Sequence, residues 1–525
     1  MKLALLAPIA TSGIAWATPS PQVPPKAPIR CARPDTSKYY INGELTPIPQ
    51  GQICQGEGEA SVLVAGNTPP PLVDTPAGAG GGGGGGAPAA QHVSRIKAKI
   101  PMPAGGAPAG IVTSCPSEKA TVTAKYTPPT PTTANADNKR LITYWSAWHG
   151  TGMSAAALPT KDQLIGVTHF ILAFWNPKTL DTFVTSVNSL WNEQTAVELK
   201  KVNPNMKVMV AVGGWGLDEF FRFNATDENR DNLADVFVEF VKLFNLDGID
   251  VDWEYPVGNG ATYLTTRPNS PCDKRNNVLL MQSIRQKLDA AKPGYVLSLA
   301  VPALEGDINL AYDEDAMKEI DKVVDFWNIM SYDAMNRRSE TTSHHAGGGV
   351  IDNTIKIYSR GVNPKKMNFG YPMYGKYFDM AAVPKDACSA AKPIGCKIPK
   401  GAFESTTGVD TGMSGVLFFN NDLHVKDVMG EIIFPIFGST KIGGAAGWTA
   451  TQAKGVRDAS ALATSYYDET QKVFYTWPSP TDVYDSCKLH LPKVGGVMVW
   501  SIDQDDGGAA GGTHFTALQK CLAGK

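Results

Sequence analysis

The chain has 525 residues, of which 19% are charged, and its net charge at pH 7 is −2. That length is too great for one ordinary hydrophobic core, but it accommodates an α/β barrel of about 250 residues or more beside a smaller region. The near-neutral charge and the lack of basic runs argue against nucleic acid or a membrane surface as a partner.

The first residues have the composition of a secretory signal. A charged start is followed by an apolar run over residues 3–16, which is too short to span a bilayer and ends in a small-x-small cleavage pattern at Ala17. A buried core helix is the alternative, but Pro8 and the terminal position disfavour it. We therefore expect residues 1–17 to be a signal peptide and the protein to be secreted and extracellular, without a membrane anchor.

The region that follows is poor in core-forming residues. Residues 66–139 are rich in Pro, Gly and Thr, including an unbroken glycine run over 80–86, and this composition is typical of a linker. Residues 18–65 contain Cys31 and Cys54, which are a candidate disulfide pair. This segment is either a small wall- or sugar-binding module or a folded piece of linker, and the sequence leaves both open.

Beyond residue 138 short apolar runs alternate with helical patterns, the rhythm of a parallel barrel. The eight expected strands are 141–146, 167–174, 207–213, 248–253, 296–301, 326–332, 367–374 and 495–501. Residues 229–244 and 276–290 have apolar residues at helical spacing. The sequence thus predicts an α/β fold, a (β/α)8 TIM barrel over 140–510, with an insertion at about 376–494 between the seventh and eighth strands and a C-terminal segment 511–525.

The fourth expected strand contains an acidic run, Asp-Gly-Ile-Asp-Val-Asp-Trp-Glu, over residues 247–254. Because successive strand residues point to opposite faces, Asp250, Asp252 and Glu254 share one face. The opposite face holds Ile249, Val251 and Trp253. Carboxylates about 6 to 7 Å apart on one face spread one another's pKa values, so such a row can retain a proton near neutral pH. A general acid requires that property.

A surface strand with a solvated polar face is the alternative for this run. Its bulky apolar opposite face and the chain break at Tyr255-Pro256 argue against that alternative. Acidic residues at the carboxyl end of a barrel strand are typical of a catalytic site.

The motif Asp247-x-x-Asp250-x-Asp252-x-Glu254 resembles the signature of the family 18 glycoside hydrolases, the chitinases. Four further stretches are similar to family elements, in the same order along the chain. These are Ala211-Val212-Gly213-Gly214-Trp215, Met330-Ser331-Tyr332-Asp333, the stretch from Phe369 to Gly375, and the stretch from Gly495 to Trp500. The resemblance extends from about residue 141 to residue 506.

The resemblance implies hydrolysis of β-1,4 linkages in chitin or chito-oligosaccharides, with retention and assistance from the substrate's own N-acetyl group. Glu254 would be the general acid, and Asp252 would hydrogen-bond the acetamido N–H and stabilise the oxazolinium intermediate. Asp250 would share its proton with Asp252, and Tyr332 would hydrogen-bond the acetamido oxygen. No cofactor or metal is expected, and a monomer is expected.

Aromatic side chains would bind the apolar faces of the sugar rings. The resemblance places Trp500 under the sugar whose bond breaks and Trp215 on the leaving-group side. The other expected substrate-binding residues are Asp333, Met330, Tyr144, Phe174 and Tyr255. For Trp175, Trp253 and Trp327 we favour a place in the core.

One residue departs from the family pattern, because Ala211 stands where a serine is expected. That hydroxyl would help to hold the inner aspartate, so we expect a shifted pH optimum rather than loss of activity.

Eight cysteines in an exported chain indicate disulfides, and Cys388–Cys396 is the best local pair. The segment of this pair, with the loop at 408–412, is similar to a loop of fungal-type chitinases. The pairing of Cys115, Cys272, Cys487 and Cys521 stays open, and Asn224 is in a glycosylation sequon.

Three alternatives remain. Among enzymes, an endo-β-N-acetylglucosaminidase that cleaves the chitobiose core of N-glycans is the runner-up. A chitin-binding lectin on the same barrel would normally have lost the acid, so the retained Glu254 counts against it. A structural wall protein would explain the Pro/Gly-rich region but not the acidic run.

Overall fold

The computed structural model describes most of the chain after residue 138, namely residues 139–146, 159–175, 193–216, 220–221, 227–258, 260, 272–384, 388–420, 444–506 and 512–524. Before these it describes the backbone of five short strands. The expected signal peptide, Cys115, Asn224 and nearly all of the expected linker lie outside the described residues. The chain divides into two units, one formed by Met1–Gly82 with Val428–Glu431 and the other by the rest.

The first unit contains two small antiparallel sheets. Its strands are β1 (Ile29–Cys31), β2 (Lys38–Ile41), β3 (Glu44–Pro47), β4 (Gln52–Gln55) and β5 (Val62–Ala65). Strands β1, β2 and β3 form one sheet, and β4 pairs with β5 to form the other. The expected segment 18–65 therefore has regular backbone pairing, while the side chains of Cys31 and Cys54 lie outside the description.

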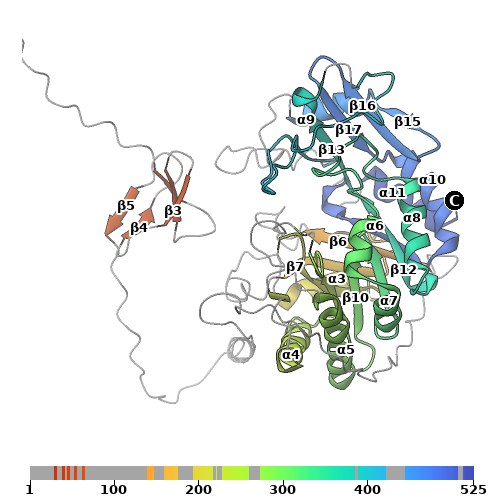
Figure 1. The fold of residues 1–525 in the computed structure, drawn as a ribbon. Helices are drawn as coiled ribbons and strands as arrows, with labels where there is room; N and C mark the ends of the chain where they lie inside the picture. The colour runs from red at the N-terminus through yellow and green to blue at the C-terminus, as the bar shows by residue number, and fades with distance from the viewer. Residues whose placement is uncertain are drawn as a thin grey trace, which may run out of the picture. The chain divides into compact units, whose positions relative to one another are not determined.

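The second unit is built on a closed barrel of eight parallel strands, which confirms the predicted fold class (Figure 1). In order around the barrel, the strands are β6 (Arg140–Ser146), β7 (His169–Trp175), β8 (Lys207–Gly213), β9 (Gly248–Asp252), β10 (Val296–Val301), β11 (Phe326–Ile329), β12 (Met367–Pro372) and β18 (Gly496–Trp500). Strand β18 closes the barrel by pairing with both β12 and β6. The eight strands lie where the apolar runs predicted them.

Helices surround these strands. They are α3 (Glu193–Val202), α4 (Asp227–Leu243), α5 (Asp273–Ala291), α6 (Glu305–Ala311), α7 (Glu314–Asp321), α8 (Gly348–Tyr358), α10 (Pro480–His490) and α11 (Thr513–Leu522). The outward strand residues pack with them in one large core, where Trp175, Trp253 and Trp327 are buried as expected. None of the described helices is both long and apolar enough to cross a bilayer.

The sixth and seventh strands are shorter than the apolar runs that predicted them. Strand β11 stops at Ile329, and β12 stops at Pro372, whose nitrogen has no hydrogen to donate to a neighbouring strand. Both differences matter for function, because they leave the residues from Met330 to Asp333, and Tyr374, beyond the strand ends.

The chain between the seventh and eighth barrel strands forms a separate antiparallel sheet. It contains β13 (Tyr374–Asp379), β14 (Ser414–Phe418), β15 (Val456–Asp458), β16 (Ala463–Asp468) and β17 (Val473–Trp477), in the order β14-β13-β17-β16-β15. Helix α9 (Gly444–Gln452) contributes Trp448, which is fully buried against this sheet. Figure 1 shows the sheet, coloured cyan to blue, as a layer separate from the barrel strands.

Disulfides fasten both the insertion and the last helices. Cys388 and Cys396 are bonded, which confirms the predicted local pair. Cys487 on α10 is bonded to Cys521 on α11, a pairing that the sequence left open. Cys272 is also disulfide-bonded.

Candidate active site

The register of the barrel brings polar residues of neighbouring strands to one level. Asp250 on β9 lies beside Ala211 of β8 on one side and Ser298 of β10 on the other. Because cross-strand partners in register point to the same face, all three side chains point into the barrel. Asp252 and Glu254 follow at two-residue spacing, with Glu254 just past the strand's end at Asp252.

Asp250 is completely buried and is held by three hydrogen bonds. The hydroxyl of Ser298 donates to Oδ1 at 2.6 Å, and the hydroxyl of Tyr144 donates to Oδ2 at 2.7 Å. The amide Nδ2 of Asn328 donates to Oδ1 at 3.2 Å. Burial raises the pKa of Asp250 to about 6, although these donors partly offset the effect. The inner aspartate therefore changes protonation near neutral pH.

Asp252 lies between two other carboxyl groups in an almost dry environment. Its side chain is 3% exposed. Burial, followed by the nearby charges of Glu254 and Asp250, raises the pKa of Asp252 well above its usual range. Within the described residues, its Oδ1 atom is buried and accepts no hydrogen bond. Asp252 thus tends to hold a proton and has an oxygen that an added donor would satisfy.

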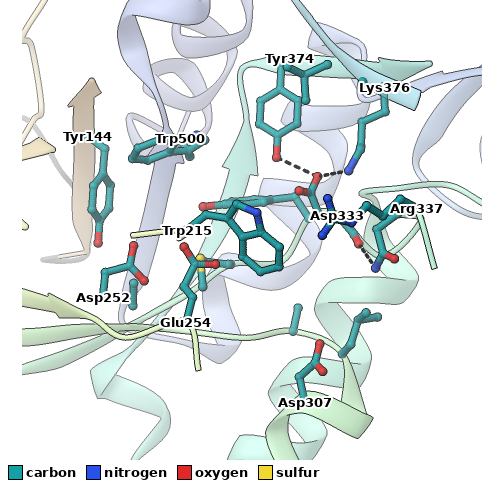
Figure 2. A pocket seen from close by; sticks show the side chains of 18 of the residues that line it. Tyr144, Trp215, Asp252, Glu254, Asp307, Asp333, Arg337, Tyr374, Lys376 and Trp500 are labelled. Atoms are coloured by element: carbon teal, nitrogen blue, oxygen red, sulfur yellow. Dashed lines mark hydrogen bonds and ion pairs between the residues drawn. The ribbon is translucent and has the colours of Figure 1, made fainter. Parts of the chain in front are cut away.

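The row of acids opens into a cavity of about 690 Å³ at the carboxyl ends of the barrel strands (Figure 2). This size is that of an ordinary small-molecule site. Of the eleven residues that the sequence proposed for the site, ten line this cavity: Tyr144, Phe174, Trp215, Asp252, Glu254, Tyr255, Met330, Tyr332, Asp333 and Trp500. The eleventh, Asp250, is in contact with Tyr144 behind the cavity wall.

Tyr332 and Asp333 lie beyond the end of β11, two strands around the barrel from the acidic row on β9. Burial and the charges of Asp252 and Glu254 raise the pKa of Tyr332 well above its usual range, so its hydroxyl stays protonated and able to donate. Asp333 accepts a hydrogen bond from Tyr374 at 2.9 Å and pairs with Lys376 at 3.1 Å. Burial would raise the pKa of Asp333, but Lys376 and His345 outweigh it and lower that pKa below its ordinary value.

Aromatic side chains form two walls of the cavity. The ring centroid of Trp500 is 5.1 Å from that of Phe174 in a stacked pair and 5.7 Å from that of Tyr144 in an edge-to-face pair. The orientation of Trp500 is therefore fixed by two neighbouring rings. Trp215 is different, because it is 48% exposed and follows a glycine pair at the end of β8. Both Trp215 and Glu254 line the cavity (Figure 2). Flat apolar surfaces beside a row of acids suit the faces of sugar rings.

Sequence reasoning missed several polar residues of the cavity. The insertion and the barrel loops supply Asp307, Arg337, Arg338, Lys376 and Asp410. Lys376 could have been predicted, since it directly follows the stretch from Phe369 to Gly375 that resembles the family. The others lie on loops or helix starts, where no periodicity marks a residue as facing a site.

Among the residues that the structure describes, one group of ion-ligand types occurs outside the cavity. Asp505, Asp506 and His514 lie close enough together to hold an ion. However, His514 Nδ1 is 2.8 Å from Asp505 Oδ1, and Asp506 accepts hydrogen bonds from the amide and hydroxyl of Thr513. These contacts fasten the beginning of α11, and we assign the group that structural role.

The cavity lies at the carboxyl ends of the parallel barrel strands and is lined by carboxyl groups and aromatic rings. This combination of fold and site is that of an α/β-barrel glycoside hydrolase. Comparison with known families gives the particular one. The chain belongs to the family described as "Glycosyl hydrolases family 18", whose model matches residues 140–505.

Curated relatives share this region. "Chitinase A1" of Niallia circulans is 32% identical over 273 residues, which are 45% of this chain and 38% of that protein. "Probable chitinase 2" of Drosophila melanogaster is 26% identical over 404 residues, which are 70% of this chain and 72% of that protein. "Endochitinase 1" of Metarhizium robertsii is 30% identical, and the matched part is 60% of its length. The chain therefore spans less than two thirds of the length of two of these relatives.

Solved structures agree on the fold. The Group IV chitinase of Ostrinia furnacalis, in complex with allosamidin, has a TM-score of 0.55 at 20% identity, and the match covers 74% of this chain and 99% of that one. Chitinase ChiA74 of Bacillus thuringiensis has a TM-score of 0.54 at 20% identity and covers 74% of this chain and 70% of that one. At such low identity these matches support the barrel alone.

Proposed function

We propose that this protein is a chitinase that hydrolyses β-1,4 linkages between N-acetylglucosamine units with retention. The observation that carries the proposal is the row Asp250, Asp252 and Glu254, in which the pKa values of both aspartates are raised and the last two members line the cavity. A row of this kind stores a proton beside the bond to be broken. The relatives named chitinases support the choice of substrate.

In the proposed reaction Glu254 donates its proton to the glycosidic oxygen, and the C–O bond to the anomeric carbon breaks. The carbonyl oxygen of the substrate's N-acetyl group forms the new bond to that carbon and gives an oxazolinium ion. Asp252 accepts a hydrogen bond from the acetamido N–H, for which its buried Oδ1 is available within the described residues. Water then attacks the anomeric carbon and displaces the N-acetyl oxygen, while one proton of the water passes to the Glu254 carboxylate. Two successive displacements at the anomeric carbon keep the β configuration.

The other cavity residues have roles in the same proposal. Tyr332 donates its hydroxyl hydrogen to the acetamido oxygen, and Asp250 exchanges a proton with Asp252. Trp500, Trp215 and the remaining cavity residues bind the sugar rings. Met330 and Asp333 border the acetamido group, with Tyr144, Phe174 and Tyr255 completing the walls.

We further propose that the protein is exported, with residues 1–17 as the signal. The disulfides Cys388–Cys396 and Cys487–Cys521 support an oxidising compartment. The expected segments 18–65, 66–139 and 511–525 and the monomeric state stay predictions, and sedimentation of the purified chain measures the last of these.

The decisive experiment is hydrolysis of N-acetylglucosamine oligomers by the wild type and by Glu254→Gln, with the product anomers recorded by proton NMR. The wild type is expected to release the β anomer. Glu254→Gln is expected to lose at least about a hundredfold in kcat, the usual contribution of a positioned proton donor. Glu198→Gln on α3 is the matched control, since Glu198 pairs along its own helix with Lys201 at 2.7 Å and is not among the cavity residues.

The same assay separates the alternatives. Normal turnover by Glu254→Gln contradicts the proposed acid. Binding of oligomers without hydrolysis by the wild type indicates a lectin, and release of glycans from a high-mannose glycoprotein, with chitin oligomers left intact, indicates an endo-β-N-acetylglucosaminidase.

A further inference from the structure

Arg338 lies where four loops of the cavity meet. Its Nε atom is 3.1 and 3.2 Å from the two carboxylate oxygens of Glu404, which belongs to the insertion. A terminal nitrogen donates to the carbonyl oxygen of Gly260, beyond the end of β9, at 3.2 Å. The guanidinium carbon is 5.8 Å from the ring centroid of Trp215, beyond β8. One side chain therefore connects the loops after β8, β9 and β11 with the insertion.

Trp215 needs such support more than Trp500 does. Gly213, Gly214 and Gly216 around it all have positive φ angles, of 107°, 96° and 80°. Glycines have no side chains that could pack against the indole, and they leave the backbone more conformations than other residues do. The ring is also about half exposed. Its orientation therefore depends on the group that contacts its face.

The guanidinium is itself fixed by a charge network. Glu404 is 8% exposed and also pairs with Arg337 at 2.5 Å, while Arg337 reaches Asp410 at 3.2 Å. A carboxylate this buried is strongly stabilised by two guanidinium groups, because water screens it little. The planar fork of arginine can serve an acid, a carbonyl and an aromatic face together, whereas the point charge of a lysine cannot.

We propose that Arg338 is a positioning residue that holds Trp215 as a sugar platform, and that the insertion controls this platform through Glu404. The proposal rests on the proposed function, since it assigns the indole a sugar to bind. It deepens that function by stating how the cleft selects length. A substrate that extends over Trp215 gains from the fixed ring, and a short substrate that ends before it does not.

The test is a double-mutant cycle for binding. All variants carry Glu254→Gln, so that the ligand is not hydrolysed during the titration. Hexa-N-acetylchitohexaose is titrated by calorimetry into this parent, into Arg338→Lys, into Trp215→Ala and into the double variant. Each single change is expected to weaken binding about three- to tenfold, the range for an aromatic or cation–π contact of about 1 kcal/mol. The double variant is expected to bind no more weakly than Trp215→Ala alone, because Arg338 acts through the indole.

A second pair of variants protects the test against misfolding. Glu404→Gln keeps the shape of the acid and removes its charge, so it is expected to weaken hexamer binding in the same direction and to show the same non-additivity with Trp215→Ala. Arg360→Lys on the surface, 3.5 Å from Glu305, is the control and is expected to bind like the parent. Di-N-acetylchitobiose is expected to bind Arg338→Lys and the parent equally.

Two outcomes overturn the inference: hexamer binding by Arg338→Lys that equals the parent, or effects of Arg338→Lys and Trp215→Ala that multiply. The fate of the proposed function is read separately, from hydrolysis of the hexamer by the chain that retains Glu254. If that chain hydrolyses the hexamer and the cycle is multiplicative, the positioning role alone is wrong. If it does not hydrolyse the hexamer, the proposed function fails whatever the cycle shows.

Discussion

At the scale of single residues, the pKa of the buried Asp250 is set by a balance between burial and hydrogen-bond donors. Asp250 has three hydrogen-bond donors and still has a pKa of about 6, because burial outweighs the donors. A donor to the carboxylate favours the charged form, and every one added lowers the pKa. The environment of Asp250 therefore offers a direct way to tune the pKa of this group, and with it the proton exchange that we propose with Asp252.

Ala211→Ser tests this tuning. Ala211 is the in-register neighbour of Asp250 on β8 and is fully buried. A serine hydroxyl there is expected to donate to Asp250 and to lower its pKa from about 6. Asp250 would then lose its proton at a lower pH as the pH rises, so the corresponding limb of the kcat/KM profile moves toward acid. Profiles between pH 4 and 9 measure the shift, and superimposable curves contradict the expectation.

Gly213 shows a different constraint at the same scale. It has a φ of 107°, and an added Cβ atom would lie 2.1 Å from the carbonyl oxygen of Asp252. Gly213→Ala is expected to cost several kcal/mol of stability, because the left-handed backbone is strained and the neighbouring backbone must move. Activity is expected to fall as well, since Asp252 is displaced.

Gly294→Ala is the matched control for that variant. Gly294 also has a positive φ, of 91°, but no atom lies within 4 Å of its added Cβ atom. Its loss is expected to be about 1 kcal/mol, with activity retained. Thermal unfolding and oligomer hydrolysis compare the two, and equal losses of stability would show that the contact with Asp252 has no effect.

At the scale of elements, the last two helices are joined covalently across a long stretch of chain. The bond between Cys487 and Cys521 closes a separation of 34 residues, whereas Cys388–Cys396 closes 8. Loop-closure entropy gives the longer loop about 4 kcal/mol of stabilisation and the shorter one about 2.5 kcal/mol. The two bonds differ in place too, since the first fastens α10 and α11 and the second a loop of the insertion.

Replacing both Cys487 and Cys521 by alanine is therefore expected to lower the unfolding temperature of the barrel by several degrees. The Cys388→Ala, Cys396→Ala pair is expected to have a smaller effect. Calorimetry on the two double variants, without reducing agent, measures the difference. A larger loss from the short loop would contradict the entropic argument.

At the scale of the whole molecule, the chain consists of a small N-terminal unit and a unit that contains the cavity. The cavity residues run from Tyr144 to Gln504 and thus all belong to the second unit. Removal of residues 1–82 is expected to leave kcat/KM for soluble oligomers unchanged. A fall in kcat/KM for soluble oligomers would contradict the expectation that the second unit alone carries the activity.

Insoluble chitin gives the same truncation a second use. If residues 18–65 bind wall polysaccharide, the shortened chain is expected to lose binding to chitin particles while its activity on oligomers stays the same. Unchanged binding to the particles would favour the alternative, a folded piece of linker.

The sequence by itself determined the barrel and the row of acids, and the physical reason is local. Alternation along β9 places Asp250, Asp252 and Glu254 on one face whatever surrounds them, and short apolar runs predict buried parallel strands. The motifs around Trp215, Tyr332 and Trp500 were readable because they occupy strand ends, where position along the chain fixes position at the barrel's mouth.

The tertiary structure alone decided which distant groups complete the site. Ser298 and Asn328 hold Asp250, and Arg338 meets Glu404, Gly260 and Trp215, across separations of 48 to 123 residues. No pattern in the sequence marks such partners. Contacts between loops depend on the register in which the barrel strands pair and on the path of the insertion. The pKa values of the aspartates belong with these contacts, because burial and the exact set of donors exist only once the barrel is closed.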